Sequence, residues 1–461
     1  MISVQNRLQQ LSGSRNLLVF GFIFLCTITL SSCGVFGKSK YDKDTVKTKP
    51  PKDKPTKVDT TRWTKLPEDK FPPITSEEKS EEEAEYETIL KYSYRVAAFI
   101  PFEINEMDLN VENSNDLRFL KYLHYYAGMQ LAMEQLEEEG VRLTLDVFDS
   151  EESKSRIEQI LDQQLPQETD AIMGPIKKEC LITLAEFGKE NRMPIISPWY
   201  SSQSVAKENP YYIQFNPFLT EYYRAITEHA LKEFSKEQIF LVGRQNTRDT
   251  DRFKYFQETA EIILEEEQPL KTFTFDQDSL STEYEIIKNR LLDDKATVFI
   301  LPNYSSRDAQ FIYDFLRRIN VEKLDNEVYV YGMPVMASMN KLSYDYLVNM
   351  NVRIVMSRFV DVSGPMEKQF QSDFFEEYNC FPMDEAYEGY DNLLFLGRAL
   401  KQYGTGFVQK LDQDNLEYLS TRFNIQPVMT DESVEDQSVE YFENQNLRII
   451  QFIEDQFQTL K

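Results

Sequence analysis

Short apolar runs alternate with longer amphipathic segments along most of the chain, from Tyr92 to the C-terminus. Residues 94–102 (YRVAAFIPF) and 170–175 (DAIMGP) have the apolar character of buried strands. Residues 116–140 carry apolar side chains at helical spacing and end at Gly140, a typical C-terminal stop. The same two patterns predict further strands at 141–150, 193–198, 238–243, 271–275, 296–302 and 327–333, and further helices at 153–165, 181–191, 220–234 and near 250–266, 283–293 and 306–319.

This alternation predicts an α/β fold in which helices cover both faces of parallel sheets. Two such runs in about 240 residues indicate two lobes rather than one. In such folds, ligands bind outside the carboxyl ends of the strands. These ends are where we expect the functional side chains, and they fall at 101–102, 174–178, 197–202, 243–247, 302–305 and 332–334.

The N-terminus has the three zones of an export signal. Arg7 and Arg15 supply positive charge, residues 17–30 are almost entirely apolar, and the run ends in LSSC at 30–33. The apolar run is shorter than the roughly 20 residues that a membrane-spanning helix needs. Small residues before a cysteine resemble the bacterial lipobox, so we expect cleavage before Cys33 and lipidation of its thiol. An ordinary secretory signal with an incidental cysteine is the alternative.

A tether is predicted between this anchor and the folded body. Residues 34–80 are rich in Lys, Pro, Thr and Asp and offer little to bury, so we expect them to be disordered. Residues 81–91 are acidic and helix-favouring and are predicted as a short lead-in helix. The segment after Cys33, GVFGKSK, lacks the acidic cluster of surface-exported lipoproteins. The richness in Lys, Asn, Tyr, Phe and Glu favours the outer membrane as the place of the anchor. The missing acidic cluster favours the side of that membrane that faces the periplasm.

Charge and cysteine content argue against several function classes. The formal net charge of −26 becomes −28 when the two arginines of the signal are removed, and so acidic a surface repels the phosphates of nucleic acids. The two histidines, and the two cysteines after Cys33, form neither a zinc-ligand pattern nor a nucleophile set. We therefore expect no enzyme activity, no metal and no cofactor. A Cys180–Cys380 disulfide is an alternative to two free thiols in an oxidising compartment.

Two blocks of sequence carry a resemblance to a known family. Residues 171–202 (AIMGPIKKECLITLAEFGKENRMPIISPWYSS) and 385–404 (EAYEGYDNLLFLGRALKQYG) resemble the type I periplasmic binding proteins, in particular the leucine/isoleucine/valine-type substrate-binding proteins of ABC transporters. Residues 444–457 look like the closing strands of that family. The resemblance implies two Rossmann-like lobes with parallel sheets joined by three crossovers. It places the N-terminal lobe at 92–216 and 357–430 and the C-terminal lobe at 217–356 and 431–461.

The resemblance also implies a ligand site at the strand ends. The family binds an amino-acid carboxylate through two hydroxyls; Ser201 matches the second, whereas Lys178 stands at the first. No Asp or Glu stands near Pro334, where the family holds the ligand ammonium. The full set of ligand-binding candidates is Lys178, Trp199, Tyr200, Ser201, Ser202, Asn246, Thr247, Asn303 and Tyr304.

Lys178 and the aromatic residues allow two interpretations. In one, Lys178 pairs with an anionic ligand group while Trp199, Tyr200 and Tyr304 stack on an apolar or ring-shaped body. In the other, the bulky side chains fill the cleft, the lysine bonds to a neighbouring carboxylate, and no small ligand binds.

Two functions follow from these interpretations. The first is a membrane-anchored solute-binding lipoprotein that captures a small polar or anionic ligand, such as an amino acid, and works with an ABC permease. The second is an interaction lipoprotein with the same fold, for example a regulator of peptidoglycan synthesis whose partner is a cell-wall synthesis enzyme. The long tether and the altered ligand positions favour the second, and the breadth of the family favours the first.

Overall fold

The computed structural model describes residues 88–104, 119–265, 268–413, 418–430 and 438–460. The predicted signal with Cys33, the tether and most of the predicted lead-in helix lie outside these residues. Residues 88–91 belong to that predicted helix but are not helical. In the part of the chain that the structure describes, no helix combines the length and apolar character needed to cross a membrane.

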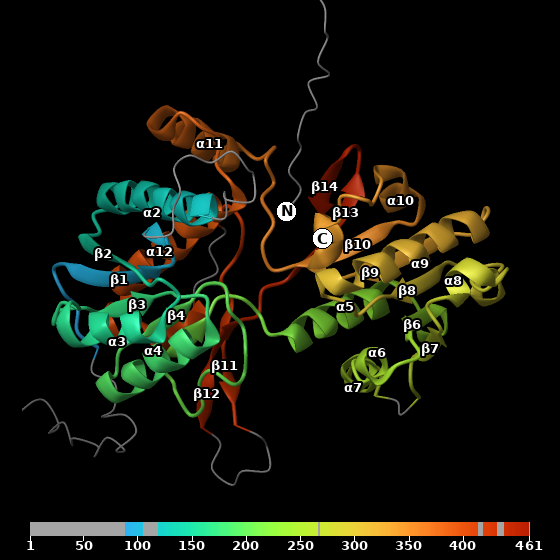
Figure 1. The fold of residues 1–461 in the computed structure, drawn as a ribbon, viewed down its shortest axis with the longest axis horizontal. Helices are drawn as coiled ribbons and strands as arrows, with labels where there is room; N and C mark the ends of the chain where they lie inside the picture. The colour runs from blue at the N-terminus through green and yellow to red at the C-terminus, as the bar shows by residue number, and fades with distance from the viewer. Residues whose placement is uncertain (1–87, 105–118, 266–267, 414–417, 431–437, 461) are drawn as a thin grey trace, which may run out of the picture. The chain divides into compact units, whose positions relative to one another are not determined.

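The first lobe contains a sheet of seven described strands in the order β11-β12-β5-β4-β3-β1-β2 (Figure 1). All neighbouring strands are parallel except β11 and β12, which are antiparallel. The strands are β1 (Tyr94–Ile100), β2 (Leu143–Asp149), β3 (Ala171–Met173), β4 (Ile195–Ser197), β5 (Tyr212–Gln214), β11 (Ile425–Met429) and β12 (Val439–Asn444).

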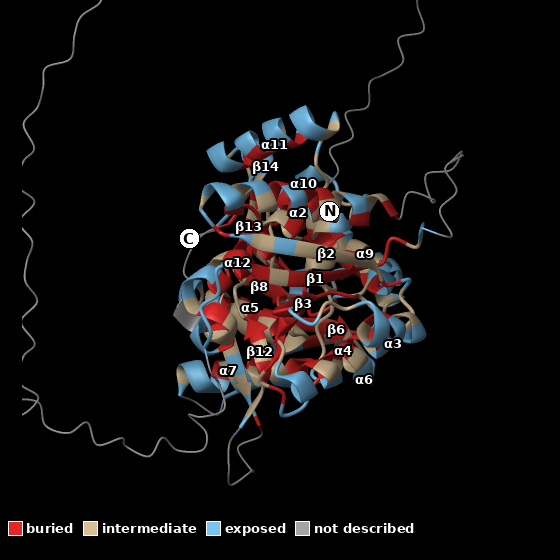
Figure 2. Ribbon diagram, turned by 90° about the vertical axis from the view of Figure 1, so that its left-hand side faces the viewer, coloured by how far each residue is buried: buried red, intermediate tan, exposed pale blue. Residues whose placement is uncertain are grey.

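Helices cover both faces of this sheet because side chains alternate along β1. Val96 and Ala98 pack with α2 and α12, whereas Ala97 and Phe99 pack with α3 and α4. Figure 2 shows β1 almost entirely buried and the edge strand β2 mostly half-buried. The helical elements of this lobe are α2 (Leu120–Glu138), α3 (Lys154–Gln163), α4 (Lys178–Asn191), α11 (Pro365–Tyr378), α12 (Asp384–Tyr403) and η9 (Gly404–Gln413).

The second lobe contains another seven described strands, in the order β14-β13-β10-β9-β8-β6-β7. Strands β6 to β10 are parallel, and β13 and β14 close the sheet as antiparallel strands. The strands are β6 (Ile239–Arg244), β7 (Lys271–Phe275), β8 (Thr297–Ile300), β9 (Val328–Gly332), β10 (Val352–Met356), β13 (Arg448–Ile453) and β14 (Gln456–Thr459).

The second sheet is also covered on both faces. Phe240 and Val242 of β6 pack with α9, whereas Ile239 and Leu241 pack with α5 and α7. The helical elements here are α5 (Leu219–Glu233), η5 (Lys236–Gln238), α6 (Thr247–Thr250), α7 (Phe253–Leu264), α8 (Ser279–Thr282), η6 (Lys288–Arg290), η7 (Ser306–Asp308), α9 (Ala309–Glu322), η8 (Pro334–Ser338) and α10 (Tyr344–Asn349).

The predicted two-lobed α/β fold is confirmed, and three details differ. The helix expected near 283–293 is wrong, since its described residues form only the short turn η6. Strand β12 belongs to the first sheet, so the third crossover lies after Asn444 and not at 430/431. Cys180 is a buried free thiol and Cys380 an exposed one, so the structure contains no bond between them.

Helices α2 and α12 approach each other at glycines. A Cβ on Gly128 would lie 1.9 Å from the carbonyl oxygen of Ala386, and a Cβ on Gly389 would lie 1.9 Å from that of Tyr125. These contacts involve backbone atoms, which cannot move without shifting a whole helix. Gly397, further along α12, would instead meet the end of the flexible Leu136 side chain at 2.5 Å.

We expect Gly389→Ala to destabilise the protein by about 3 kcal/mol, because the two helices must separate to accept the methyl group. Gly397→Ala is the matched control on the same helix. Its gain in helix propensity of about 1 kcal/mol should offset most of the cost of moving Leu136. Urea unfolding of both variants measures the difference, and equal losses of stability would contradict the close helix contact.

Candidate ligand-binding site

Trp199 follows the carboxyl end of β4 and is held firmly within the first lobe. The centroid of its ring lies 4.5 Å from that of Tyr125 and 6.0 Å from that of Tyr122. Its Nε1–H donates to Glu388 Oε2 at 2.9 Å, and its carbonyl oxygen accepts from Asn216 Nδ2 at 3.1 Å. The indole therefore has a fixed position, and its one donor is already used.

The hydroxyl groups predicted to bind a ligand also have partners within the protein. Ser201 Oγ donates to the carbonyl oxygen of Pro217 at 2.9 Å, and Ser202 Oγ shares a hydrogen bond with Ser204 Oγ at 2.8 Å. Tyr200 packs against the core beneath α3 and α4. A ligand carboxylate would have to displace the Ser201 contact to be bound as the family resemblance implies.

Lys178 differs from these residues because no described residue accepts a hydrogen bond from its ammonium group. It opens α4 and is half-buried, and it forms no hydrogen bond or ion pair with another described residue. The neighbouring Lys177 takes the carboxylate instead, with its Nζ 3.4 Å from Glu152 Oε2. Within the described part of the chain, the Lys178 ammonium group therefore remains available to an anionic group at this strand end.

Arg358 brings a second cation to the first lobe. It follows the carboxyl end of β10 and donates from Nη2 to Asn392 Oδ1 of α12 at 3.0 Å. Its Nε is 3.9 Å from Glu388 Oε1, and its side chain is 12% exposed. Burial raises the pKa of Glu388, and the charge of Arg358 opposes that shift. Arg358 Nη1 is buried without a hydrogen-bond partner among the described residues.

A buried charge network lies at the carboxyl ends of β6 and β8 in the second lobe. Arg244 donates from Nε and Nη2 to both oxygens of Asp249, at 2.7 and 3.0 Å, and from Nη2 to Asp308 Oδ1 at 2.5 Å. Arg252 Nη1 is 3.5 Å from Asp249 Oδ1. Burial opposes ionisation of Asp249, but hydrogen bonds from Arg244 outweigh it and lower the pKa of this carboxyl group.

Asn303 joins this network and leaves acceptors unused. Its Nδ2 donates to Asp249 Oδ1 at 3.3 Å. Asn303 Oδ1 and Asp308 Oδ2 are buried without a hydrogen-bond partner in the described part of the chain. Tyr304, beside them, is 45% exposed, and the guanidinium of Arg252 lies 4.8 Å from its ring centroid. The network therefore presents two buried oxygen acceptors next to an accessible aromatic ring.

The other two predicted residues of the second lobe have a local structural role. Asn246 caps α6 by accepting a hydrogen bond from the backbone N–H of Asp249 at 2.9 Å. Thr247 begins that helix and is exposed. Asn246 thus helps to place Asp249 beneath Arg244.

The crossovers between the lobes are linked by hydrogen bonds. Asn216 Oδ1 in the first crossover accepts from Ser357 Oγ in the second at 3.0 Å and from Tyr222 OH of α5 at 3.1 Å. Glu443 of β12 accepts from the backbone N–H of Phe218, just before α5, and from Gln214 Nε2. A buried carboxylate of the first sheet thus receives the first N–H of the second lobe.

The charged residues at these strand ends were missed by sequence reasoning. Arg244, Asp249, Asp308 and Arg358 belong to no motif, although Arg244 follows a predicted strand directly. Their partner Glu388 lies on α12, in the block 385–404 that carries the family resemblance, but was not singled out there. Charged residues one to eight positions after a buried strand were the available signal. In the described residues, no cluster of three or more His, Cys, Asp or Glu side chains could hold a metal ion.

Comparison with protein families shows which family the chain belongs to. Residues 124–432, more than half of the chain, match the model of the receptor family ligand binding region. The chain belongs to this family. No curated protein matches the chain.

Solved structures of this ligand-binding family share the fold. A branched-chain amino acid ABC transporter protein of Rhodospirillum rubrum is 12% identical with a TM-score of 0.55, covering 80% of this chain and 100% of its own. An ABC transporter substrate-binding protein of Desulfitobacterium hafniense is 14% identical, with a TM-score of 0.52 and the same coverage. A branched-chain amino acid transporter ligand-binding protein of Burkholderia xenovorans is 12% identical, with a TM-score of 0.51, and covers 80% and 95%. The type I periplasmic binding protein fold is therefore shown.

Removing the charge of Asp249 should destabilise the second lobe. Asp249→Asn keeps the shape but leaves Arg244 with one carboxylate fewer in a buried position, which costs about 3 kcal/mol. Chemical denaturation should show this loss for Asp249→Asn and no change for Asp294→Asn, whose side chain is in an exposed loop. A loss of less than about 1 kcal/mol, as for a surface pair, would argue against the network.

Glu443 should make stability depend on pH. Burial raises its pKa to about 7 from 4.5, so the folded chain binds a proton more tightly than the unfolded chain does. The free energy of unfolding should therefore rise by about 2 kcal/mol between pH 8 and pH 5.5 from this group alone.

Glu443→Gln should lose this part of the pH dependence. A smaller pH dependence of the free energy of unfolding, due to Asp391, should remain, because burial raises the pKa of that residue to about 6. Unfolding curves at several pH values compare the two proteins, and equal slopes would contradict the assignment.

Proposed function

We propose that the protein is a solute-binding lipoprotein, anchored through Cys33, that captures a small ligand at the facing strand ends of its lobes. The ligand carries an anionic group and a hydrogen-bond donor, as an amino acid does. The shared fold and the family membership support a binding role. Binding rather than catalysis is proposed, with an ABC permease as the partner.

The observation that carries this proposal is that three buried polar atoms at the strand ends have no hydrogen-bond partner among the described residues. Arg358 follows the end of β10, and Asn303 and Asp308 follow the end of β8. The buried atoms in question are Arg358 Nη1, Asn303 Oδ1 and Asp308 Oδ2. A buried polar group without a partner costs about 1–3 kcal/mol, and more when it is charged. Such groups persist when something satisfies them, and a ligand at the strand ends can do so.

The chemistry of these atoms indicates which ligand group each one binds. A guanidinium N–H donates to a carboxylate or another anion. The carboxylate oxygen of Asp308 and the amide oxygen of Asn303 accept, so they suit an ammonium or hydroxyl group. Lys178 provides a further cation for the anionic end, and Tyr304 offers an aromatic surface for the body of the ligand.

A second candidate function rests on Trp199 and Ser201. The indole is fixed between Tyr125 and Glu388, and the Ser201 hydroxyl is bonded to Pro217. Side chains that fill and satisfy a cleft in this way favour an interaction lipoprotein. Its partner would be a protein such as a cell-wall synthesis enzyme.

Thermal-shift measurements on the full chain in detergent test the proposal. Amino acids, small carboxylic acids and peptidoglycan fragments are the ligands to screen. A ligand at 100 times its dissociation constant should stabilise the protein by about 2.7 kcal/mol. Arg358→Met should abolish the shift, and Lys368→Met on α11, with an exposed side chain, should retain it. No shift with any compound, together with capture of a cell-wall synthesis enzyme, would favour the interaction lipoprotein.

A further inference from the structure

A separate cavity lies at the far end of α12 from the candidate ligand-binding site. It has a volume of about 380 Å³ and lies between the last turns of α12 and η9. Arg398, in its wall, is ten residues beyond Glu388, which corresponds to about 15 Å along a helix axis. A volume of this size is within the range of small-molecule pockets.

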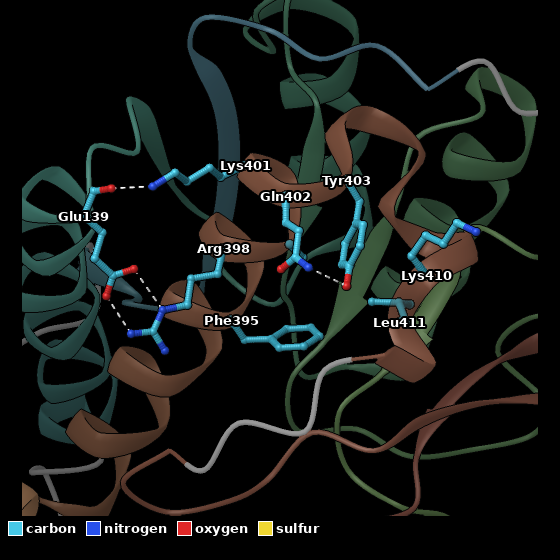
Figure 3. A pocket seen from close by; sticks show the side chains of 9 residues that line it. Glu139, Phe395, Arg398, Lys401, Gln402, Tyr403, Lys410 and Leu411 are labelled. Atoms are coloured by element: carbon cyan, nitrogen blue, oxygen red, sulfur yellow. Dashed lines mark hydrogen bonds and ion pairs between the residues drawn. The ribbon is translucent and has the colours of Figure 1, made fainter.

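The floor of the cavity is apolar. Phe395, Ala399 and Leu411 line it and are buried, and the ring of Tyr403 stands above them (Figure 3). Figure 3 shows the side chains of Phe395, Tyr403 and Leu411 turned toward one common space. This surface suits the hydrocarbon part of a ligand.

The walls of the cavity are basic. The lining contains three basic residues, Arg398, Lys401 and Lys410, and a single acidic residue, Glu139, in a chain whose net charge is −26. Figure 3 shows Arg398 and Lys401 turned toward Glu139 and Lys410 on the opposite side. Arg398 donates from Nη2 and Nε to the two carboxylate oxygens of Glu139 at 2.6 and 3.0 Å, and Lys401 donates to the backbone carbonyl oxygen of Glu139. These contacts tie the end of α2 to α12 and form a fixed wall.

Two donors on the opposite side remain for a ligand. Tyr403 OH accepts from Gln402 Nε2 at 2.8 Å, so its own proton is free to be donated. Lys410 is exposed and pairs with no other described residue. Figure 3 shows the Lys410 side chain directed away from the Tyr403 hydroxyl, so this flexible and exposed lysine must turn inward to share an acid group with it. A phenol O–H above an apolar floor and a lysine within reach of it match an acid group attached to a hydrocarbon body.

The chain also enters the folded body beside this cavity. Ile89 donates its N–H to Thr405 Oγ1 at 3.1 Å, and Thr405 N–H donates to the Ile89 carbonyl oxygen at 3.1 Å. Gly404 has φ +71° and lies so close to Ile89 that a Cβ would be 2.5 Å from its carbonyl oxygen. Ile89, near the start of the described residues, is therefore fixed against the two residues that follow Tyr403.

We propose that this cavity binds an anionic amphiphile, with its acid group on Tyr403 and Lys410 and its hydrocarbon part on Phe395 and Leu411. The acid group is a phosphate or carboxylate, and its source is either a membrane lipid or a soluble molecule. This site is independent of the ligand site between the lobes.

The test uses the full chain in nanodiscs of neutral phosphatidylcholine. Soluble dihexanoyl phosphatidic acid is titrated by calorimetry in one arm. In the other arm, phosphatidylglycerol is added to the nanodiscs and amide hydrogen exchange is followed in residues 398–411. We expect binding or protection in at least one arm, and the arm that responds identifies the source. Inorganic phosphate alone should bind more weakly, because it lacks the hydrocarbon part.

The double variant Lys410→Gln/Tyr403→Phe should weaken binding about tenfold or more, because both donors to the acid group are lost. Lys368→Gln/Tyr313→Phe removes the same groups from α11 and α9 and should bind like the original chain. Melting curves show whether each variant is folded. No response in either arm, or equal binding by both double variants, would overturn the proposal.

Discussion

Helices α2 and α12 lie so close together at Gly128 and Gly389 that a β-carbon on either would overlap a backbone oxygen of the other helix. The first lobe depends on this contact, because α12 carries residues of both proposed sites along its length. Its first half holds Glu388 and Asn392, which position Trp199 and Arg358. Its last half carries the wall of the cavity beside η9. The close contact with α2 therefore fixes the position of α12 on the sheet, while the two ends of α12 carry polar side chains.

The two lobes stabilise buried charge in different ways. In the first, Asp391 is fully buried and accepts hydrogen bonds from Leu419 and Ser420, yet burial still raises its pKa. In the second, Asp249 is paired with Arg244 in a bidentate contact, and its pKa is lowered. Arg244 and Arg252 balance the charges of Asp249 and Asp308, so the second lobe keeps a paired and neutral network at its strand ends. Arg358 carries a positive charge to the first lobe. The two lobes thus differ in the polar groups that they offer to the proposed ligand: a guanidinium donor in the first, and the acceptors Asn303 Oδ1 and Asp308 Oδ2 in the second.

The core strands could be predicted because their apolar runs, such as Val96–Ile100, are buried on both faces. Strand β12 (VEYFEN) was assigned to the wrong lobe, since its charged side chains give no apolar signal and Glu443 becomes buried through tertiary contacts. The helix expected at 283–293 fails because Glu322 of α9 accepts the backbone N–H groups of Ile287 and Lys288. The family resemblance supplied Lys178 and Ser201 as candidates. Arg358 and Asp308 could not be predicted, because their contacts with Asn392 and Arg244 join residues that are distant in sequence.

The crossovers give the binding that we propose at the strand ends a route to the whole molecule. Asn216 contacts Trp199, Ser357 and Tyr222, so one amide joins the backbone carbonyl group of Trp199 in the first lobe, the second crossover and the first helix of the second lobe. Arg358 is the next residue after Ser357. The anion that we propose at Arg358 would therefore act directly beside the segment that must bend if the lobes move. Glu443 holds the neighbouring crossover through Phe218, and its protonation changes that contact. The proposed ligand and the proton on Glu443 would thus act on adjacent crossovers. Both could therefore shift the equilibrium between different arrangements of the lobes.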